Sequence, residues 1–242
     1  MNTKGTSMNH TDDSSLAVLG WLAAIGAGGA DELVGACGLP AGVVRARLRM
    51  LEDAGLVRSD RLLHGAPALH TLTRRGLRAA GRPDLDPVAV SAAGFAHLLA
   101  VARVAVALGG GAYRLGGERD LRAAERAAGR ALASAEVGYA SGGAIALHRP
   151  DLVCWQEQAP IAVEVELTVK APARLRAIVR GWARSRLVGG VVYYASPPAL
   201  RAVSQALRVE SAGAAVVALP LERAGELPPL RSTPLASPTT TL

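Results

Sequence analysis

The chain has very few lysines, cysteines and aromatic residues. Lys4 and Lys170 are the only lysines among 27 basic residues, so arginine carries nearly all of the net charge of +7. This excess of base over acid favours a polyanionic partner. Cys37 and Cys154 lack the paired spacing of a disulfide framework or a zinc site, which fits a reducing cytoplasm.

Long apolar runs are also scarce, and this argues against export and membrane insertion. Residues 1–13 are polar and acidic where a signal peptide would be apolar, so we expect a disordered leader. The one membrane-length run, residues 88–108, contains His97 and Arg103. Because a central arginine costs about 2.5–3.5 kcal/mol in a bilayer, the run predicts a buried helix inside a linker segment, residues 83–112. We therefore expect no membrane partner.

The first third of the chain predicts three helices followed by a hairpin. Val44, Leu48 and Leu51 recur at helical spacing after Pro40, two short strands follow at 56–58 and 69–72, and Thr73 caps a further helix.

This order resembles the winged helix-turn-helix domains of bacterial regulators over residues 14–82. The resemblance implies a third helix in the DNA major groove, with Arg45, Arg47 and Arg49 as contacts. A solvated arginine face and a protein-docking module are the alternatives.

Beyond the linker the pattern becomes that of an α/β unit, residues 113–222. We expect a helix over 118–135, strands at 137–139, 144–155, 161–169, 190–195 and 214–219, and helices over 172–186 and 198–208. Strands that alternate with helices after a hairpin predict a mixed sheet, so the chain as a whole is α+β. Residues 223–242 are rich in proline, serine and threonine and predict a disordered tail.

One strand carries an unusual polar face. Glu164, Glu166, Thr168 and Lys170 share a parity along residues 161–170, and the residues of the opposite parity are apolar. Two glutamates on one face repel each other unless a cation intervenes. Exposed carboxylates balanced by arginines are the alternative to a functional site.

Pro150-Asp151, followed by Glu164, resembles the PD-(D/E)XK nuclease core, and the domain is expected to be restriction-endonuclease-like. The family's lysine would stand two residues after Glu164, where this chain has Glu166. The same segment, from His148 to Lys170 and preceded by a winged helix, is similar to the replication-relaxation family of plasmid and mobile-element proteins. That resemblance implies DNA binding in plasmid replication or mobilisation.

The carboxylates suggest a metal site on chemical grounds. Mg²⁺, or Mn²⁺ in its place, prefers oxygen ligands, which Asp151, Glu164 and Glu166 could supply. Lys170 or His148 could then stabilise charge or carry a proton. This geometry requires Asp151 to lie opposite one of the glutamates rather than opposite Val165.

A basic helix is expected after the polar strand. Eight cations and no acid lie between Leu167 and Val209. Four of them begin the helix or line one of its sides, namely Arg174, Arg176, Arg180 and Arg184. A nucleic-acid backbone would stabilise such a row of like charges, and a solvated face is the alternative.

Three functions remain open. The first is a cytoplasmic DNA-binding protein of plasmid or mobile-element replication or mobilisation, whose nuclease-like domain is catalytically degenerate. The second is a Mg²⁺-dependent endonuclease or nickase, and the third is a winged-helix transcriptional regulator. A second copy of the chain and other replication or mobilisation proteins remain open as partners.

Overall fold

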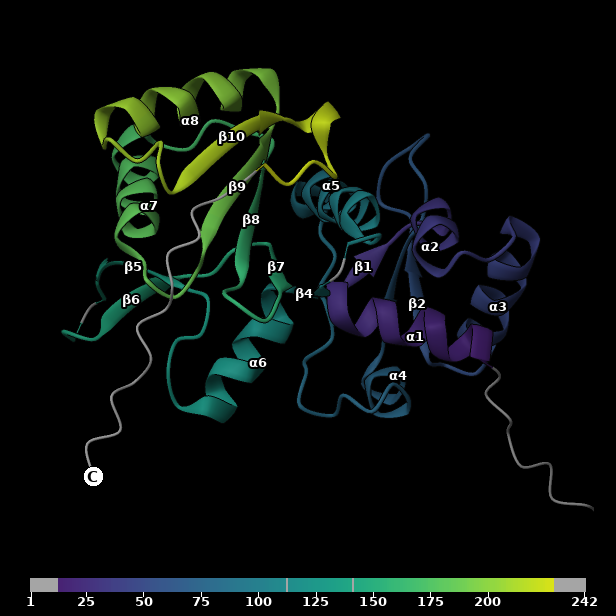
Figure 1. Cartoon of the computed structure of the whole chain (residues 1–242). Helices are drawn as coiled ribbons and strands as arrows, with labels where there is room; N and C mark the ends of the chain where they lie inside the picture. Colours follow the sequence, from purple (N-terminus) through teal and green to yellow (C-terminus); the bar gives the residue numbers. More distant parts are fainter. Residues whose placement is uncertain (1–12, 112, 141, 229–242) are drawn as a thin grey trace, which may run out of the picture.

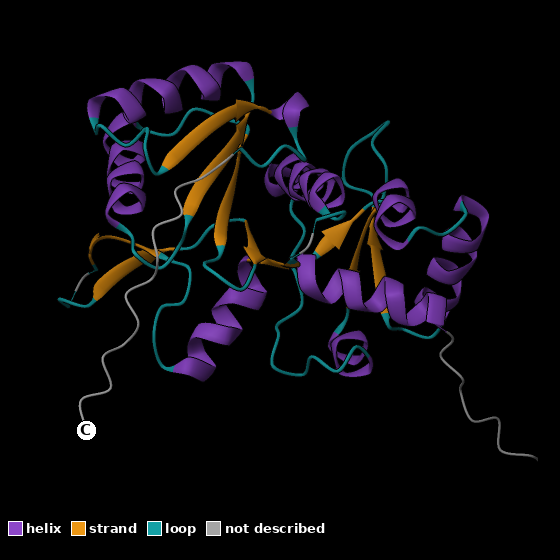
Figure 2. Ribbon diagram, in the orientation of Figure 1, coloured by secondary structure: helices purple, strands orange, loops and turns teal. Residues whose placement is uncertain are grey.

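The computed structural model describes residues 13–111, 113–140 and 142–228 of the 242-residue chain. Within these residues the protein is a mixed α/β structure with a five-stranded, a three-stranded and a two-stranded sheet (Figures 1 and 2). The α+β fold class expected from the sequence is therefore confirmed. Residues 1–12 of the expected leader and residues 229–242 of the expected tail lie outside the described residues.

The N-terminal unit has the element order of a winged helix. It consists of α1 (Asp13–Ile25), β1 (Ala27–Gly28), α2 (Ala30–Cys37), α3 (Ala41–Asp53), β2 (Val57–Asp60), β3 (Leu69–Leu72) and α4 (Arg74–Ala79). Strand β3 lies between β1 and β2 and is antiparallel to both. Val44, Leu48 and Leu51 of α3 pack with α1 and α2 in one core, as their spacing predicts.

Helix α5 (Ala92–Leu108) connects the two halves of the molecule. It begins after Ser91, whose hydroxyl caps the helix at Gly94, so it starts four residues later than the apolar run suggests. The helix packs against α2 and β1 on one side and against β8 on the other, and Figure 1 shows it between the two sheets. The expected linker thus contains a central core helix. No helix in the described ranges is long and apolar enough to span a bilayer.

The second unit is built on the five-stranded sheet. Its elements are β4 (Arg114–Gly117), α6 (Glu118–Ala128), β5 (Ala135–Tyr139), β6 (Ile145–His148), β7 (Leu152–Trp155), β8 (Ile161–Glu166), α7 (Pro172–Arg184), β9 (Gly190–Ala195), α8 (Pro197–Val209), β10 (Val216–Pro220) and the 3₁₀ turn η1 (Leu221–Arg223). The sheet order is β10-β9-β8-β7-β4. Strands β8, β9 and β10 are parallel, whereas β7 is antiparallel to both β8 and β4.

Three local expectations differ from the structure. The helix expected over 118–135 ends at Ala128, because Gly129 adopts a left-handed conformation after it. The strand expected over 144–155 is interrupted at Pro150, and its halves join different sheets. The segment 223–228 contacts the core, where Tyr194 Oη donates a 2.6 Å hydrogen bond to the carbonyl of Glu226.

The large sheet is covered on both faces. Helix α7 packs on one face through Leu175 and Trp182 and α8 through Val203, while α5 packs on the other face against Val163 and Val165. Figures 1 and 2 show this three-layer arrangement. Side chains of either parity along β8 are consequently buried, including the two glutamates.

Candidate functional site

The candidate site lies where β7 begins and β8 ends. The antiparallel register pairs Leu152 with Val163, and Asp151 and Glu164 are the next residues outward on the two chain segments. Asp151 Oδ2 also accepts a 2.7 Å hydrogen bond from the backbone N–H of Val165. The side chains nevertheless diverge, because Asp151 meets His97 of α5 on one side of the sheet and Glu164 meets Trp182 of α7 on the other.

Both glutamates of β8 are buried. Glu164 retains 4% and Glu166 5% of its accessible surface, because α7 covers the face toward which they point. The alternative of exposed strand carboxylates balanced by surface arginines is therefore wrong. Buried carboxylates require partners, since an unpaired charge away from water is strongly destabilising.

Glu164 is held by a histidine and a tryptophan. Its Oε1 lies 2.7 Å from His148 Nε2 and accepts a 2.9 Å hydrogen bond from the indole N–H of Trp182. Burial raises the pKa of Glu164. Burial lowers the pKa of His148, but the charge and hydrogen bond of Glu164 outweigh it, and the net pKa is raised. Because the two groups are in direct contact, they titrate as a pair rather than independently.

Asp151 has a second histidine partner. His97 Nε2, from the first half of α5, lies 2.9 Å from Asp151 Oδ1. This hydrogen bond outweighs burial and raises the pKa of His97. The sequence indicated only that His97 interrupts an apolar run, and no local pattern connects it to a residue 54 positions away.

Lys170 reaches the cluster by a different route from the one expected. Strand β8 ends at Glu166, so the alternation does not continue to Lys170, and Thr168 is exposed outside the cluster. The chain turns after Leu167 and brings Lys170 Nζ into direct contact with Glu166 Oε2. Lys170 thus pairs with Glu166, which stands where the PD-(D/E)XK family carries its lysine.

Tyr193 is a buried neighbour that the sequence did not single out. It lies on β9 beside Glu164 of β8, and its hydroxyl is buried without a hydrogen-bond partner among the described residues. Burial, followed by the charges of Glu164, Glu166 and Asp151, raises the pKa of Tyr193 well above its usual value. An unsatisfied buried hydroxyl beside carboxylates marks a place for a water or another ligand.

The donor set suits a hard cation held by few protein ligands. In the described part of the chain, no group of three or more His, Cys, Asp or Glu side chains is arranged to hold a metal ion. Asp151 uses both of its oxygens in hydrogen bonds. Glu164 Oε2 and Glu166 Oε1 make no hydrogen bond to another described residue. Mg²⁺ commonly takes one or two carboxylates together with water, so these two oxygens, rather than the three-carboxylate set expected, are the ones that would hold it.

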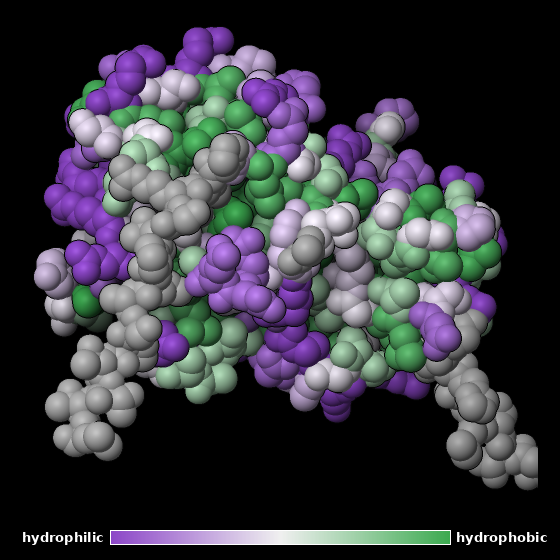
Figure 3. All heavy atoms as spheres, viewed as in Figure 1, coloured by the Kyte–Doolittle hydropathy of each residue, from purple (hydrophilic) through white to green (hydrophobic). Residues whose placement is uncertain are grey.

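Helix α7 exposes the predicted arginines. All four are exposed, and Arg176, Arg180 and Arg184 lie on the side opposite the buried stripe, whereas Arg174 is in the first turn of the helix; Figure 3 shows hydrophilic side chains along the outer edge over α7 and α8. Arg180 forms two hydrogen bonds, of 2.7 and 2.9 Å, with Glu210. This glutamate stands just beyond the acid-free interval and partly neutralises the row.

The three arginines of α3 have different surroundings. Arg45 and Arg49 are exposed and, together with Arg61, line a hollow of 370 Å³ between α3 and the β2–β3 hairpin. Arg47 is half-buried, and its Nε donates a 3.0 Å hydrogen bond to Ser14 Oγ on α1. Arg45 and Arg49 are therefore placed to meet a ligand, while Arg47 connects two helices.

Fold and site together define a winged helix joined to a mixed sheet with a buried carboxylate, histidine and lysine cluster. Comparison with models of known protein families and with curated proteins gives no match for this chain. The function is therefore inferred from the chemistry of the site itself.

Proposed function

We propose that the chain is a DNA-binding protein of plasmid or mobile-element replication or mobilisation, of the replication-relaxation type. The observation that carries the proposal is the exposed pair Arg45 and Arg49 on the third helix of a winged-helix arrangement. In that arrangement the third helix enters the major groove, where arginine recognises guanine or contacts phosphate. The net charge of +7 supports the same partner.

The arginines of α7 would extend this contact to the second unit. Arg176 and Arg184 are exposed and have no carboxylate within ion-pair distance among the described residues, unlike Arg180. Two free guanidinium groups are suited to phosphates of the DNA backbone. On DNA bound to both units, α3 would set the position of the protein and α7 would add affinity.

A second candidate, a Mg²⁺-dependent endonuclease or nickase, is supported by two contacts around the end of β8: Asp151 accepts from the Val165 amide, and Lys170 contacts Glu166. Helix α5, strands β4, β7 and β8, helix α7 and strand β9 follow the order of the PD-(D/E)XK core. Glu164 and Glu166 would hold the cation, which would supply water activation and charge stabilisation when bound. Lys170 would place its ammonium beside Glu166, and His148 would hold a proton at Nε2.

Salt-dependent binding to duplex DNA tests the leading proposal. If Arg45 and Arg49 each neutralise one phosphate, Arg45→Ala/Arg49→Ala should reduce the slope of log affinity against log salt by about 1.8, at about 0.9 per phosphate. Arg122→Ala/Arg223→Ala is the matched control, since it removes the same charge from two exposed ion pairs on α6 and η1. An unchanged slope in the first variant, or an equal change in the control, would contradict DNA contact by α3.

Cleavage of supercoiled plasmid with Mg²⁺ or Mn²⁺ tests the enzyme. Asp151→Ala is a poor probe, because Asp151 also holds the Val165 amide and His97. Glu166→Gln keeps the shape of the site and should abolish cleavage while circular dichroism and duplex affinity stay unchanged. If wild type does not cut, or Glu166→Gln cuts equally well, the enzyme candidate is removed and the DNA-binding proposal remains.

The regulator alternative makes a different prediction. Selection from random duplexes should then return one preferred sequence, and Arg45→Ala/Arg49→Ala should lose that preference. Enrichment of no sequence would exclude specific regulation without affecting general DNA binding.

A further inference from the structure

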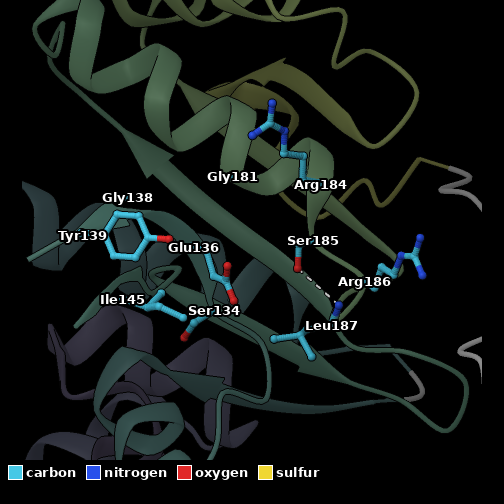
Figure 4. A pocket seen from close by; sticks show the side chains of 10 residues that line it. All are labelled: Ser134, Glu136, Gly138, Tyr139, Ile145, Gly181, Arg184, Ser185, Arg186 and Leu187. Carbon is cyan, nitrogen blue, oxygen red and sulfur yellow. Dashed lines mark hydrogen bonds between the residues drawn. The ribbon is translucent and has the colours of Figure 1, made fainter. Parts of the chain in front are cut away.

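A hollow lies between the β5–β6 hairpin and the C-terminal end of α7, and Arg184 is the one residue of its lining that the proposed function already uses. Its volume is 440 Å³, within the range of about 300–1,000 Å³ typical of small-ligand sites. Glu136, Tyr139 and Ile145 contribute from the hairpin, and Arg184 and Arg186 from α7 and the segment after it. Figure 4 shows the Tyr139 ring on one side of the hollow and Arg184 on the helix across from it.

Tyr139 is exposed in a chain that otherwise covers its aromatic side chains. It retains 80% of its accessible surface, whereas the other Phe, Trp and Tyr residues are buried or half-buried. The backbone that carries the ring belongs to a two-stranded hairpin rather than to a loop, with a bulge between Glu136 and Tyr139. A positioned, solvent-facing ring is a surface on which a planar group can stack.

Charge around the hollow is divided between two sides. Arg184 and Arg186 have no carboxylate within 4 Å among the described residues, so both are available to an anion. Glu136, also without an ion-pair partner in the described chain, lies between the ring and the arginines. A carboxylate disfavours a simple anion there but accepts hydrogen bonds from an amino group such as N4 of cytosine.

A ligand with a planar base bearing an amino group, joined to a phosphate, satisfies all three features. We propose that this hollow binds an unpaired nucleotide of single-stranded DNA. The base stacks on Tyr139, its amino edge meets Glu136, and its phosphates meet Arg184 and Arg186. The strand must be unpaired, because both faces of a base inside a duplex are covered by its neighbours.

The hollow adjoins the carboxylate cluster through α7. Gly181 lines the hollow, and a Cβ at this position would lie 2.5 Å from the carbonyl oxygen of Glu136, so only glycine allows the hairpin to approach the helix this closely. The next residue, Trp182, donates to Glu164. On the hairpin, Ala135 pairs with His148, the partner of Glu164. One turn of α7 would therefore separate an unpaired strand in the hollow from the carboxylate cluster.

This inference rests on the proposed function in taking DNA as the partner, and its test uses residues outside α3. Fluorescence anisotropy of the full chain with a labelled single-stranded oligonucleotide should show that Tyr139→Ala weakens binding roughly 5- to 150-fold, the loss expected for one stacked base. Tyr139→Phe keeps the ring and should stay within about twofold of wild type. Arg186→Ala should weaken single-strand binding, and affinity for a blunt duplex should be unchanged in all three variants.

The outcomes separate this inference from the proposed function. No loss of single-strand affinity in Tyr139→Ala, or an equal loss for the duplex, overturns the hollow as a nucleotide site. Tighter Tyr139-dependent binding of an RNA of the same sequence overturns the assignment to DNA. If Arg45→Ala/Arg49→Ala leaves duplex binding unchanged while Tyr139→Ala abolishes single-strand binding, the proposed function fails and the hollow stands.

Discussion

His70 should make the winged-helix unit sensitive to acid. The side chain lies on β3 with 8% of its surface exposed, and its Nδ1 lies 2.6 Å from Ser59 Oγ. Burial, reinforced by the charge of Arg61, lowers the pKa of His70 from 6.5 to about 4. The folded protein therefore holds the imidazole neutral over a pH range in which the unfolded chain binds a proton.

The sign and size of the effect follow from this pKa difference. Between pH 6.5 and pH 4 the unfolded state binds more protons than the folded state, so stability falls as the pH falls. A pKa shift from 6.5 to about 4 corresponds to a loss of about 2 kcal/mol in the free energy of unfolding between pH 7 and pH 5, and of about 3 kcal/mol once the pH is below 4. His97 and His148 have raised pKa values and act in the opposite direction.

A comparison of two proteins isolates the contribution of His70. Urea unfolding of wild type and His70→Gln at pH 7 and pH 5 cancels the effect of titrating groups away from this site, because glutamine does not titrate; Glu52, whose Oε1 lies 3.7 Å from His70 Nδ1, is the carboxylate that the substitution also touches. We expect the difference in unfolding free energy between the two proteins to change by about 2 kcal/mol between the two pH values, with wild type the one that loses stability. Parallel pH profiles would refute a buried neutral histidine at this position.

Two further substitutions test the packing and the buried network. Gly76→Ala would place a Cβ 2.0 Å from the carbonyl oxygen of Leu56, so it should lower the free energy of unfolding in urea by about 1–3 kcal/mol. Gly42 is the control, because it is exposed on α3 and an added Cβ would meet no atom within 4 Å. Gly42→Ala should therefore raise the free energy of unfolding by about 0.5–1 kcal/mol. Trp182→Phe removes the N–H donor to the buried Glu164 and should cost about 1–3 kcal/mol, measured by circular dichroism during unfolding; an unchanged midpoint would mean that the hydrogen bond contributes nothing.

The helices of this protein could be predicted from the sequence because their signals are local. Val44, Leu48 and Leu51 place the core side of α3 within a single helix. The N-cap Thr73 accepts the expected hydrogen bond from the Gly76 amide, and Gly38 ends α2 in a left-handed conformation. Caps and periodicity act within a few residues, so neither needs information from the tertiary structure.

The strands were harder to predict because their pairing is nonlocal. Strand β4, Arg114–Gly117, contains two glycines and has no alternating pattern, yet it forms one edge of the large sheet. The strand expected over 144–155 divides at Pro150, where the halves separate into different sheets. Proline marks such a break, but the sheet that each half joins depends on its partners.

The candidate site shows the same division between local and distant information. Asp151 and Glu164 could be placed together because they flank one hairpin whose register is short-range. The burial of Glu164 could not be predicted, because strand alternation indicates a polar face without indicating that α7 covers it. His97 could not be assigned either, since it reaches Asp151 only through the packing of α5 on the sheet.

The packing of α5 also limits how the two units can cooperate. Arg103 on this helix donates a 3.1 Å hydrogen bond to Glu32 of α2, and His97 on the same helix pairs with Asp151. Between these two contacts Ala100 and Val101 are buried in the core of the large sheet. A helix packed in this way fixes the distance and the orientation between the two units, whereas a flexible linker would leave both variable. If α3 positions the protein on duplex DNA, the carboxylate cluster must then face the DNA at one fixed offset. Any nick by the second candidate function would fall at a constant distance from the site that α3 recognises.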